Sequence, residues 1–187
     1  MKRFLTLLFT TLLLSAALCA TASASDFDGV AKELSAIGMF RGTDSGFELD
    51  RAPTRSEAAI MLVRLYGAEE EAAAAYQAGK ITHPFTDVGD TAAPYVAWLY
   101  QNGISKGTSA TTFGSGACSA QNYTVFLLRA LGYEDGKDFQ YADAASFAMT
   151  RGLFDVSMLT GPFLRDDLAA VTYQALGADL KDGSTYL

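Results

Sequence analysis

Cysteine and histidine are scarce in this chain of 187 residues, which has two cysteines and one histidine. Cys19 lies in an apolar N-terminal segment, so Cys118 would be the only cysteine once that segment is removed and could form no disulfide within the chain. His83 has no second histidine at metal-ligand spacing, and no Gly-x-Ser-x-Gly motif is present. These absences argue against a hydrolase or a metalloenzyme, so we expect no enzymatic activity, no metal and no cofactor.

Basic residues are also few. The chain has 14 lysines and arginines against 21 acidic residues, for a formal net charge of −7. An acidic protein is a poor partner for nucleic acid, because it cannot neutralise many phosphates at once. An anionic partner would have to be held by a few local cations, and we expect no nucleic acid among the partners.

Residues 1–24 have the order of a secretory signal peptide. A short basic start precedes an uncharged, largely apolar run (Phe4–Leu18), and Ala-Ser-Ala at 22–24 offers a cleavage site. The run is too short and too rich in Thr and Ser for a membrane span, and no second candidate follows. We predict a secreted chain that begins at Ser25, has no membrane span after cleavage and carries a formal charge of −9 (12 basic minus 21 acidic residues).

A two-helix unit occurs three times in the mature sequence. Each copy has an apolar helix, a glycine, a polar loop with a phenylalanine, and a second helix that ends in glycine. The copies span Val30–Gly67, Tyr95–Gly132 and Ala144–Gly177. The segment Ala68–Pro84 is additional, and its Ala and Glu content predicts a connecting helix that ends before Pro84.

The glycines and the second helices of the units predict the fold class. Each glycine follows a helix pattern, where a left-handed residue is expected. The second helices are apolar on nearly every side, which is typical of central helices. We therefore predict an all-α protein in which three second helices form one bundle. The glycines in question are Gly38, Gly103 and Gly152 in mid-unit and Gly67, Gly132 and Gly177 at the unit ends.

The stretch Thr-Arg-Ser-Glu at 54–57 predicts the start of the second helix in the first unit. Thr54 and Glu57 fit a capping box, which explains both residues structurally. Arg55 would occupy the first helical position, where the positive end of the helix dipole disfavours a cation by about 0.3–1 kcal/mol. The same position holds Ala120 in the second unit and Arg165 in the third when the closing glycines are aligned.

Two interpretations of Arg55 remain open from the residues alone. An arginine beside the free N–H groups of a helix start makes an anion site for a carboxylate or phosphate. A salt bridge to an acid such as Asp50 or Asp87 is the alternative. Trp98, on the outer helix of the second unit, also has two interpretations: packing, or a stacking platform for a sugar ring.

The order of these motifs resembles the repeat of S-layer homology domains of bacterial surface proteins. That repeat runs from Phe-x-Asp-Val through a helix to Gly-Ile, then a Gly-rich turn with a Phe, then Thr-Arg-Ala-Glu. The second unit gives FTDV (85–88), NGISKG (102–107) and Phe113. The first unit gives GMFRG, Phe47 and TRSE, and the third gives GLFD, Phe163 and LRDD.

The resemblance implies three helix–loop–helix repeats in a pseudo-threefold arrangement around a central three-helix bundle, with grooves between units. It implies non-covalent attachment to the cell wall or S-layer through a secondary cell-wall polysaccharide, often one with pyruvate ketals. The alternative is a helical scaffold that binds another surface protein. The implied division is a signal peptide (1–24), repeats at 25–67, 85–133 and 134–177, a connecting helix (68–84) and a tail (178–187).

The resemblance also implies that the motif arginine meets the anionic group of the polymer. We expect most binding at Arg55 and less at Arg165, and we place Glu57, Asp87 and Trp98 in the same candidate site. Departures from the family pattern weaken the other groove positions. They are Ala120 and Asn122 in place of the second unit's Arg and Glu, Thr91 where many members have Trp, and Leu164 in place of a capping hydroxyl.

Overall fold

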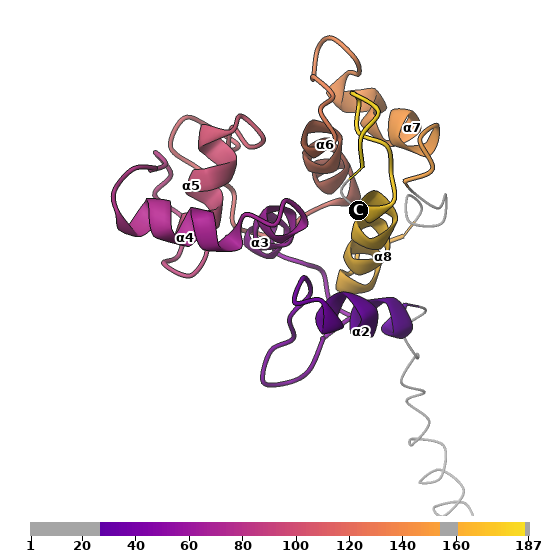
Figure 1. The fold of residues 1–187 in the computed structure, drawn as a ribbon, viewed down its shortest axis with the longest axis horizontal. Helices are drawn as coiled ribbons and strands as arrows, with labels where there is room; N and C mark the ends of the chain where they lie inside the picture. The colour runs from indigo at the N-terminus through magenta and orange to yellow at the C-terminus, as the bar shows by residue number, and fades with distance from the viewer. Residues whose placement is uncertain (1–26, 154–160, 186–187) are drawn as a thin grey trace, which may run out of the picture.

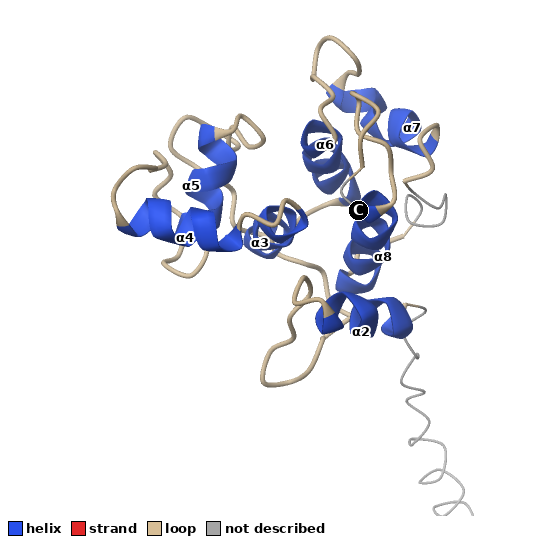
Figure 2. Cartoon of the chain, viewed as in Figure 1, coloured by secondary structure: helices blue, strands red, loops and turns tan. Residues whose placement is uncertain are grey.

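The structure, a computed structural model, describes residues 27–153 and 161–185, so the predicted signal peptide lies outside the described residues. Within these ranges the chain consists of helices and loops without strands, which confirms the all-α class (Figures 1 and 2). The elements are α2 (Asp28–Ala36), α3 (Arg55–Leu65), α4 (Glu69–Gln77), α5 (Ala93–Gln101), α6 (Ala120–Ala130), η1 (Tyr141–Asp143), α7 (Ala144–Met149) and α8 (Arg165–Leu176).

The three second helices, α3, α6 and α8, start where the sequence predicts. The Thr54 hydroxyl accepts from the Glu57 amide at 3.1 Å, and the Glu57 carboxylate accepts from the Thr54 amide at 2.7 Å, which confirms the capping box. The Ser119 hydroxyl caps α6 by accepting from an amide of its first turn. Leu164 cannot cap α8 in this way, but its own amide donates to the Asp167 carboxylate at 2.8 Å.

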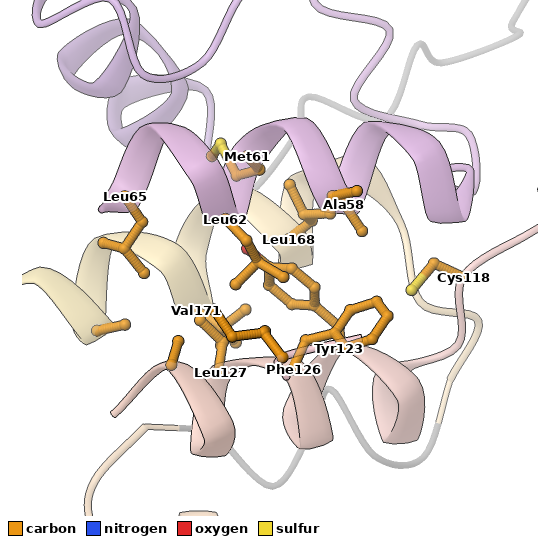
Figure 3. Packing of buried hydrophobic residues seen from close by; sticks show 14 of the residues in the cluster. Ala58, Met61, Leu62, Leu65, Cys118, Tyr123, Phe126, Leu127, Leu168 and Val171 are labelled. Carbon is orange, nitrogen blue, oxygen red and sulfur yellow. The ribbon is translucent and has the colours of Figure 1, made fainter. Parts of the chain in front are cut away.

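Stability in this chain comes from packing, because the buried Cys118 is not in a disulfide. Helices α3, α6 and α8 contact one another pairwise, and their inner side chains interdigitate in the core (Figure 3). Each fully buried leucine there contributes about 2 kcal/mol. A buried hydrogen bond of 2.7 Å between the Tyr123 and Thr172 hydroxyls also joins α6 to α8. The pseudo-threefold relation of the units stays a prediction.

The first helix of each unit packs on the second helix of the preceding unit. Helix α5 contacts α3, α7 contacts α6, and α2 contacts α8 (Figure 1). The units are thus joined in a ring that α2 closes against α8. The additional helix α4 lies within the predicted connection 68–84 and packs on α5. This arrangement places the loop of one unit beside the start of the second helix of another.

Five of the six glycines that end a helix pattern have the predicted left-handed conformation, and the sixth does not. Gly177 has a φ of −97°, so that prediction is wrong at this position. The reason lies in the chain that follows. Residues 178–185 continue along the end of α6, where the Lys181 amide donates to the Leu131 carbonyl at 2.8 Å. The segment after α8 therefore packs on the second unit.

Candidate functional site

Arg55 is the first residue of α3 and meets the loop of the second unit there. Its backbone N–H donates to the Gly116 carbonyl at 2.8 Å, and the Cys118 amide donates to the Pro53 carbonyl at 2.7 Å. The expectation that free N–H groups surround Arg55 is therefore wrong for its own amide, because the neighbouring loop accepts that bond. The Arg55 amide therefore contributes nothing to an anion site, and the contribution of Arg55 would come from its side chain.

The Arg55 guanidinium is buried between two aromatic rings. The side chain belongs to a residue only 6% exposed, and its central carbon lies 4.4 Å from the ring centre of Phe126 and 5.2 Å from that of Phe113. Its Nε has no hydrogen-bond partner. Among the described residues no acid pairs with it, Asp50 and Asp87 included. Burial lowers the pKa of Arg55, since no neighbouring carboxylate offsets the loss of water.

Asp87 holds the loop against which Arg55 packs. Its carboxylate accepts from the amides of Phe113 at 2.7 Å, Gly114 at 2.8 Å and Ser115 at 3.2 Å. The amide of Phe113, followed by those of Gly114 and Ser115, lowers the pKa of Asp87. Asp87 is therefore committed to the loop and acts on Arg55 through the position of the Phe113 ring.

Arg165 occupies the same helix position in α8, but each nitrogen of its guanidinium has a hydrogen-bond partner. Its Nη1 donates to Glu57 Oε1 at 2.7 Å, and its Nε donates to the Phe47 carbonyl at 2.8 Å. Its Nη2 donates to the Arg41 carbonyl at 3.3 Å, and the guanidinium lies 4.9 Å from the centre of the Phe40 ring. Arg165 thus ties α8 to the loop of the first unit and to α3.

Glu57 is the centre of the ionic contacts at this junction. Besides Arg165 and the Thr54 amide, its carboxylate accepts two hydrogen bonds from Arg51, at 2.6 and 2.9 Å. Burial alone would raise the pKa of Glu57, but the bonds from Arg51 and Thr54 and the charge of Arg165 lower it to about 2. Glu57 is therefore an anion that fixes the positions of two arginines.

A pocket of about 290 Å³ opens beside Arg165 and Glu57, between α3, α8 and the loop of the first unit. Thr91 lines it, at the position where many members of the resembled family have Trp. Arg41 and Arg64 also line it, and both donate to the carboxylate of Glu69, Arg41 at 3.1 and 2.8 Å. Three arginines therefore line a pocket that is otherwise largely apolar, with Phe40 and Met61 among its other residues.

Trp98 lies apart from this pocket. The residue is 9% exposed, its Nε1 donates to Glu71 at 3.3 Å, and its ring centre lies 5.0 Å from that of Tyr66. This placement favours the packing interpretation over a stacking platform. Of the predicted site residues, Arg165 and Glu57 contact each other directly. Asp87 acts on Arg55 only indirectly, because it fixes the loop that carries Phe113. Trp98 instead contacts Glu71 and Tyr66.

Arg64 and Arg129 are residues that the sequence analysis missed. Arg64 Nη1 donates to the Met39 carbonyl at 3.4 Å, and Arg129 Nη1 donates to the Ile104 carbonyl at 3.1 Å. Each bond holds the turn after the first helix of the unit. The signal was present, because both arginines stand three residues before a closing glycine.

The second unit has Ala120 where the others have arginine, and a larger hollow lies there. A pocket of about 510 Å³ is lined by Ala120 together with Ala117, Cys118 and Phe163. Burial raises the pKa of the Cys118 thiol to about 12, so the thiolate, the reactive form, is rare at neutral pH. The second unit therefore has no arginine at this position, and the pocket beside it is larger than the one beside Arg165.

No group of three or more His, Cys, Asp or Glu side chains in residues 27–153 and 161–185 is arranged to hold a metal ion. In the same part of the chain, no helix has the length and apolar character that crossing a membrane requires.

Comparison with known proteins identifies the segment that carries the Asp87 loop. Residues 84–114 match the family model of the S-layer homology domain. That segment is similar to the S-layer homology domain. The S-layer homology domain is a binding module associated with the bacterial cell wall, so the match supports wall attachment and a cell-surface location in general. It covers the first part of the predicted second unit, through α5 and Phe113, and ends before α6, so the repeat character of the three units stays a prediction.

A similar curated protein is the endoglucanase of Bacillus sp. (strain KSM-635). The two are 34% identical over 84 residues, which are 42% of this chain and 9% of the endoglucanase. The chain therefore matches less than a tenth of that relative. The activity in that protein's name does not extend to this chain through so short a match.

Proposed function

We propose that this protein attaches non-covalently to the bacterial cell wall by binding an anionic secondary cell-wall polysaccharide, with Arg55 as the main contact for the polymer's charge. One observation carries the proposal: Arg55 is a buried guanidinium without an acid partner among the described residues of an acidic protein. A buried unpaired charge is costly, and an anion with hydrogen-bond acceptors would offset that cost.

The 290 Å³ pocket supplies a second part of the proposed site. Arg165 is held by Glu57, and Arg41 and Arg64 line the same pocket. This set of donors suits a carboxylate on a sugar ring, for which a pyruvate ketal is the example that the resemblance implies. Because Arg165 already has an acid partner, we expect it to contribute less than Arg55.

Export and surface location complete the proposal. Residues 1–24 have signal-peptide order, and the matched domain family is a wall-associated one. The mature protein would then be exposed to wall polymers outside the cell. An acidic chain would meet acidic polymers with overall repulsion, so local arginines rather than net charge must hold the ligand.

The test is co-sedimentation of the mature protein with purified cell-wall sacculi, before and after chemical removal of the secondary polymer. Arg55→Met keeps an apolar side chain against Phe113 and Phe126 and removes the charge. Lys32→Ala is the matched control, because it removes one cation from an exposed pair with Asp28 on α2. Arg165→Met is compared in parallel.

We expect binding that requires the polymer, is lost in Arg55→Met, is weakened in Arg165→Met and is unchanged in Lys32→Ala. Binding that survives both arginine substitutions would overturn the role of Arg55. Binding that survives polymer removal would instead point to a protein partner on the wall. Thermal unfolding of each variant confirms that loss of binding is not loss of fold.

A further inference from the structure

Arg151 is the second arginine without an acid partner. In residues 27–153 and 161–185 every other arginine except Arg55 forms an ion pair with a carboxylate. Arg151 belongs to no repeat motif, and it follows α7 in the third unit; helix α7 itself lies on the far side of α6 from α3 (Figure 1). The residue is exposed, so its guanidinium is accessible to a ligand.

Two aromatic rings hold the Arg151 guanidinium in place. Its central carbon lies 5.0 Å from the ring centre of Tyr133 and 5.5 Å from that of Phe147. The two rings pack edge to face at 5.2 Å, and Phe139 stacks on Phe147 at 5.8 Å. Contact with aromatic rings restrains a guanidinium while its N–H groups stay available for a planar anion.

A pocket of about 370 Å³ opens in front of Arg151. The segment after α8 forms its other wall with Asp179 and Lys181, and Asp138 lies at its edge. Lys181 Nζ contacts the Asp138 carboxylate at 2.7 Å, so the charge of Asp138 is already balanced. The Asp179 carboxylate has no lysine or arginine partner among the described residues, so the same pocket holds an acceptor and an unpaired cation.

We infer that this pocket, the Arg151 pocket, binds an acidic sugar. The guanidinium of Arg151 takes the sugar's carboxylate or phosphate through paired N–H donors, and Asp179 accepts from its hydroxyl groups. The volume lies in the range of small-ligand sites. An isolated inorganic anion would be disfavoured by Asp179, so the ligand must offer donors as well as a negative charge.

The Arg151 pocket is independent of the proposed contact at Arg55. It uses no motif arginine, and its walls come from the third unit, from Tyr133 in the loop after α6 and from residues 179–183. The inference therefore stands or falls separately from wall attachment. If both sites act, one polymer chain could engage the protein at two places, which raises its effective affinity without new contacts.

The test is an NMR titration of the ¹⁵N-labelled mature protein with D-glucuronate, D-glucose 6-phosphate and D-glucose. We expect saturable shifts at the amides of Gly152, Lys181 and Gly183 with the two acids and none with glucose. The tighter of the two acids identifies whether a carboxylate or a phosphate is preferred. Arg151→Gln should weaken that binding by roughly tenfold or more.

Three controls separate the outcome from misfolding and from the Arg55 contact. Arg151→Lys keeps the charge without the planar fork and should give an intermediate affinity. Lys137→Gln removes a nearby, mostly exposed cation and should change nothing. Arg55→Met should leave the titration intact. Absence of saturable shifts in the wild type, or equal affinity in a folded Arg151→Gln, would overturn the inference.

Discussion

Arg165 donates to Glu57 across the junction of the first and third units, with 2.7 Å between Nη1 and Oε1 and 108 positions between the residues in sequence. The arginine residue is almost fully buried and the carboxylate is partly exposed. Arg51 approaches the same carboxylate from the loop of the first unit. One acid that also caps α3 therefore joins α8 to α3.

Substitution Glu57→Gln should cost about 2 kcal/mol of unfolding free energy at pH 7, because it leaves Arg165 buried without its counter-charge. The folded pKa of Glu57, about 2, lies below its ordinary value of 4.5. The unfolded state therefore takes up the proton first as the pH falls. The stabilisation is complete above about pH 4.5 and is lost between there and pH 2.

Urea unfolding of the wild type and Glu57→Gln at pH 7, 4 and 3 tests this pH dependence. The difference between the two proteins should shrink as the pH decreases. Lys137→Gln serves as the control, because the Lys137–Glu134 pair is exposed and should matter little. A difference that is constant over this range would mean that the charge of Glu57 is not the stabilising feature.

Arg55→Met should stabilise the fold by about 1 kcal/mol while removing wall binding. A buried unpaired charge is replaced by an apolar side chain of similar length, and the gain exceeds the lost contact of the cation with Phe113 and Phe126. Equilibrium unfolding in urea measures the change. A clear loss of stability would show that the guanidinium is structural and would count against its role as a ligand contact.

Gly107→Ala should be more damaging than Gly103→Ala, although both glycines are left-handed. A Cβ on Gly107 would lie 2.3 Å from a ring carbon of Phe85 and 2.6 Å from the Thr112 carbonyl oxygen, whereas one on Gly103 would meet nothing within 4 Å. We expect losses of about 3 and about 1 kcal/mol respectively. Thermal melts of the two variants measure these losses of stability, and equal losses would contradict the predicted clash.

Ala120→Arg should create a third cationic groove position. The pocket of about 510 Å³ beside Ala120 has room for the side chain, and Phe163 lies in its lining as Phe113 lies beside Arg55. If wall attachment operates as proposed, polymer affinity should rise by roughly threefold to tenfold in the sedimentation assay. Ala120→Met fills the space without charge and should leave the affinity unchanged. A gain in both variants would assign the effect to packing.

Local signals in the sequence are sufficient to predict the second helices of the units. Thr54 and Glu57 identified the start of α3, and apolar character on all sides identified the central position of α3 and α6. Gly177 was mispredicted because its conformation depends on where the following residues pack. The Lys181–Leu131 hydrogen bond that decides it joins residues distant in sequence, and no local pattern encodes such a contact.

The sequence predicts only part of the candidate site, because the rest also depends on contacts between residues distant in the sequence. Arg55 was identifiable because a cation at a helix start is locally unfavourable. Its burial between two rings that both belong to the second unit, Phe113 and Phe126, could not be read from spacing. Asp87 was assigned to the site, but its partners are the amides of residues 113–115, so its effect on Arg55 is indirect. Arg151 had no motif at all, and only the folded chain shows that it lacks an acid.

The packing of α2 on α8 has a consequence for how the molecule is made. During synthesis α2 leaves the ribosome long before its partner exists, so its apolar face stays uncovered until almost the whole chain has emerged. Contacts of such high sequence separation slow folding, since a long loop must close before they form. In a circular permutant with new termini in the exposed connection 78–82 and a linker from residue 185 to residue 27, α2 would follow α8 directly, so their contact would form without the closure of a long loop.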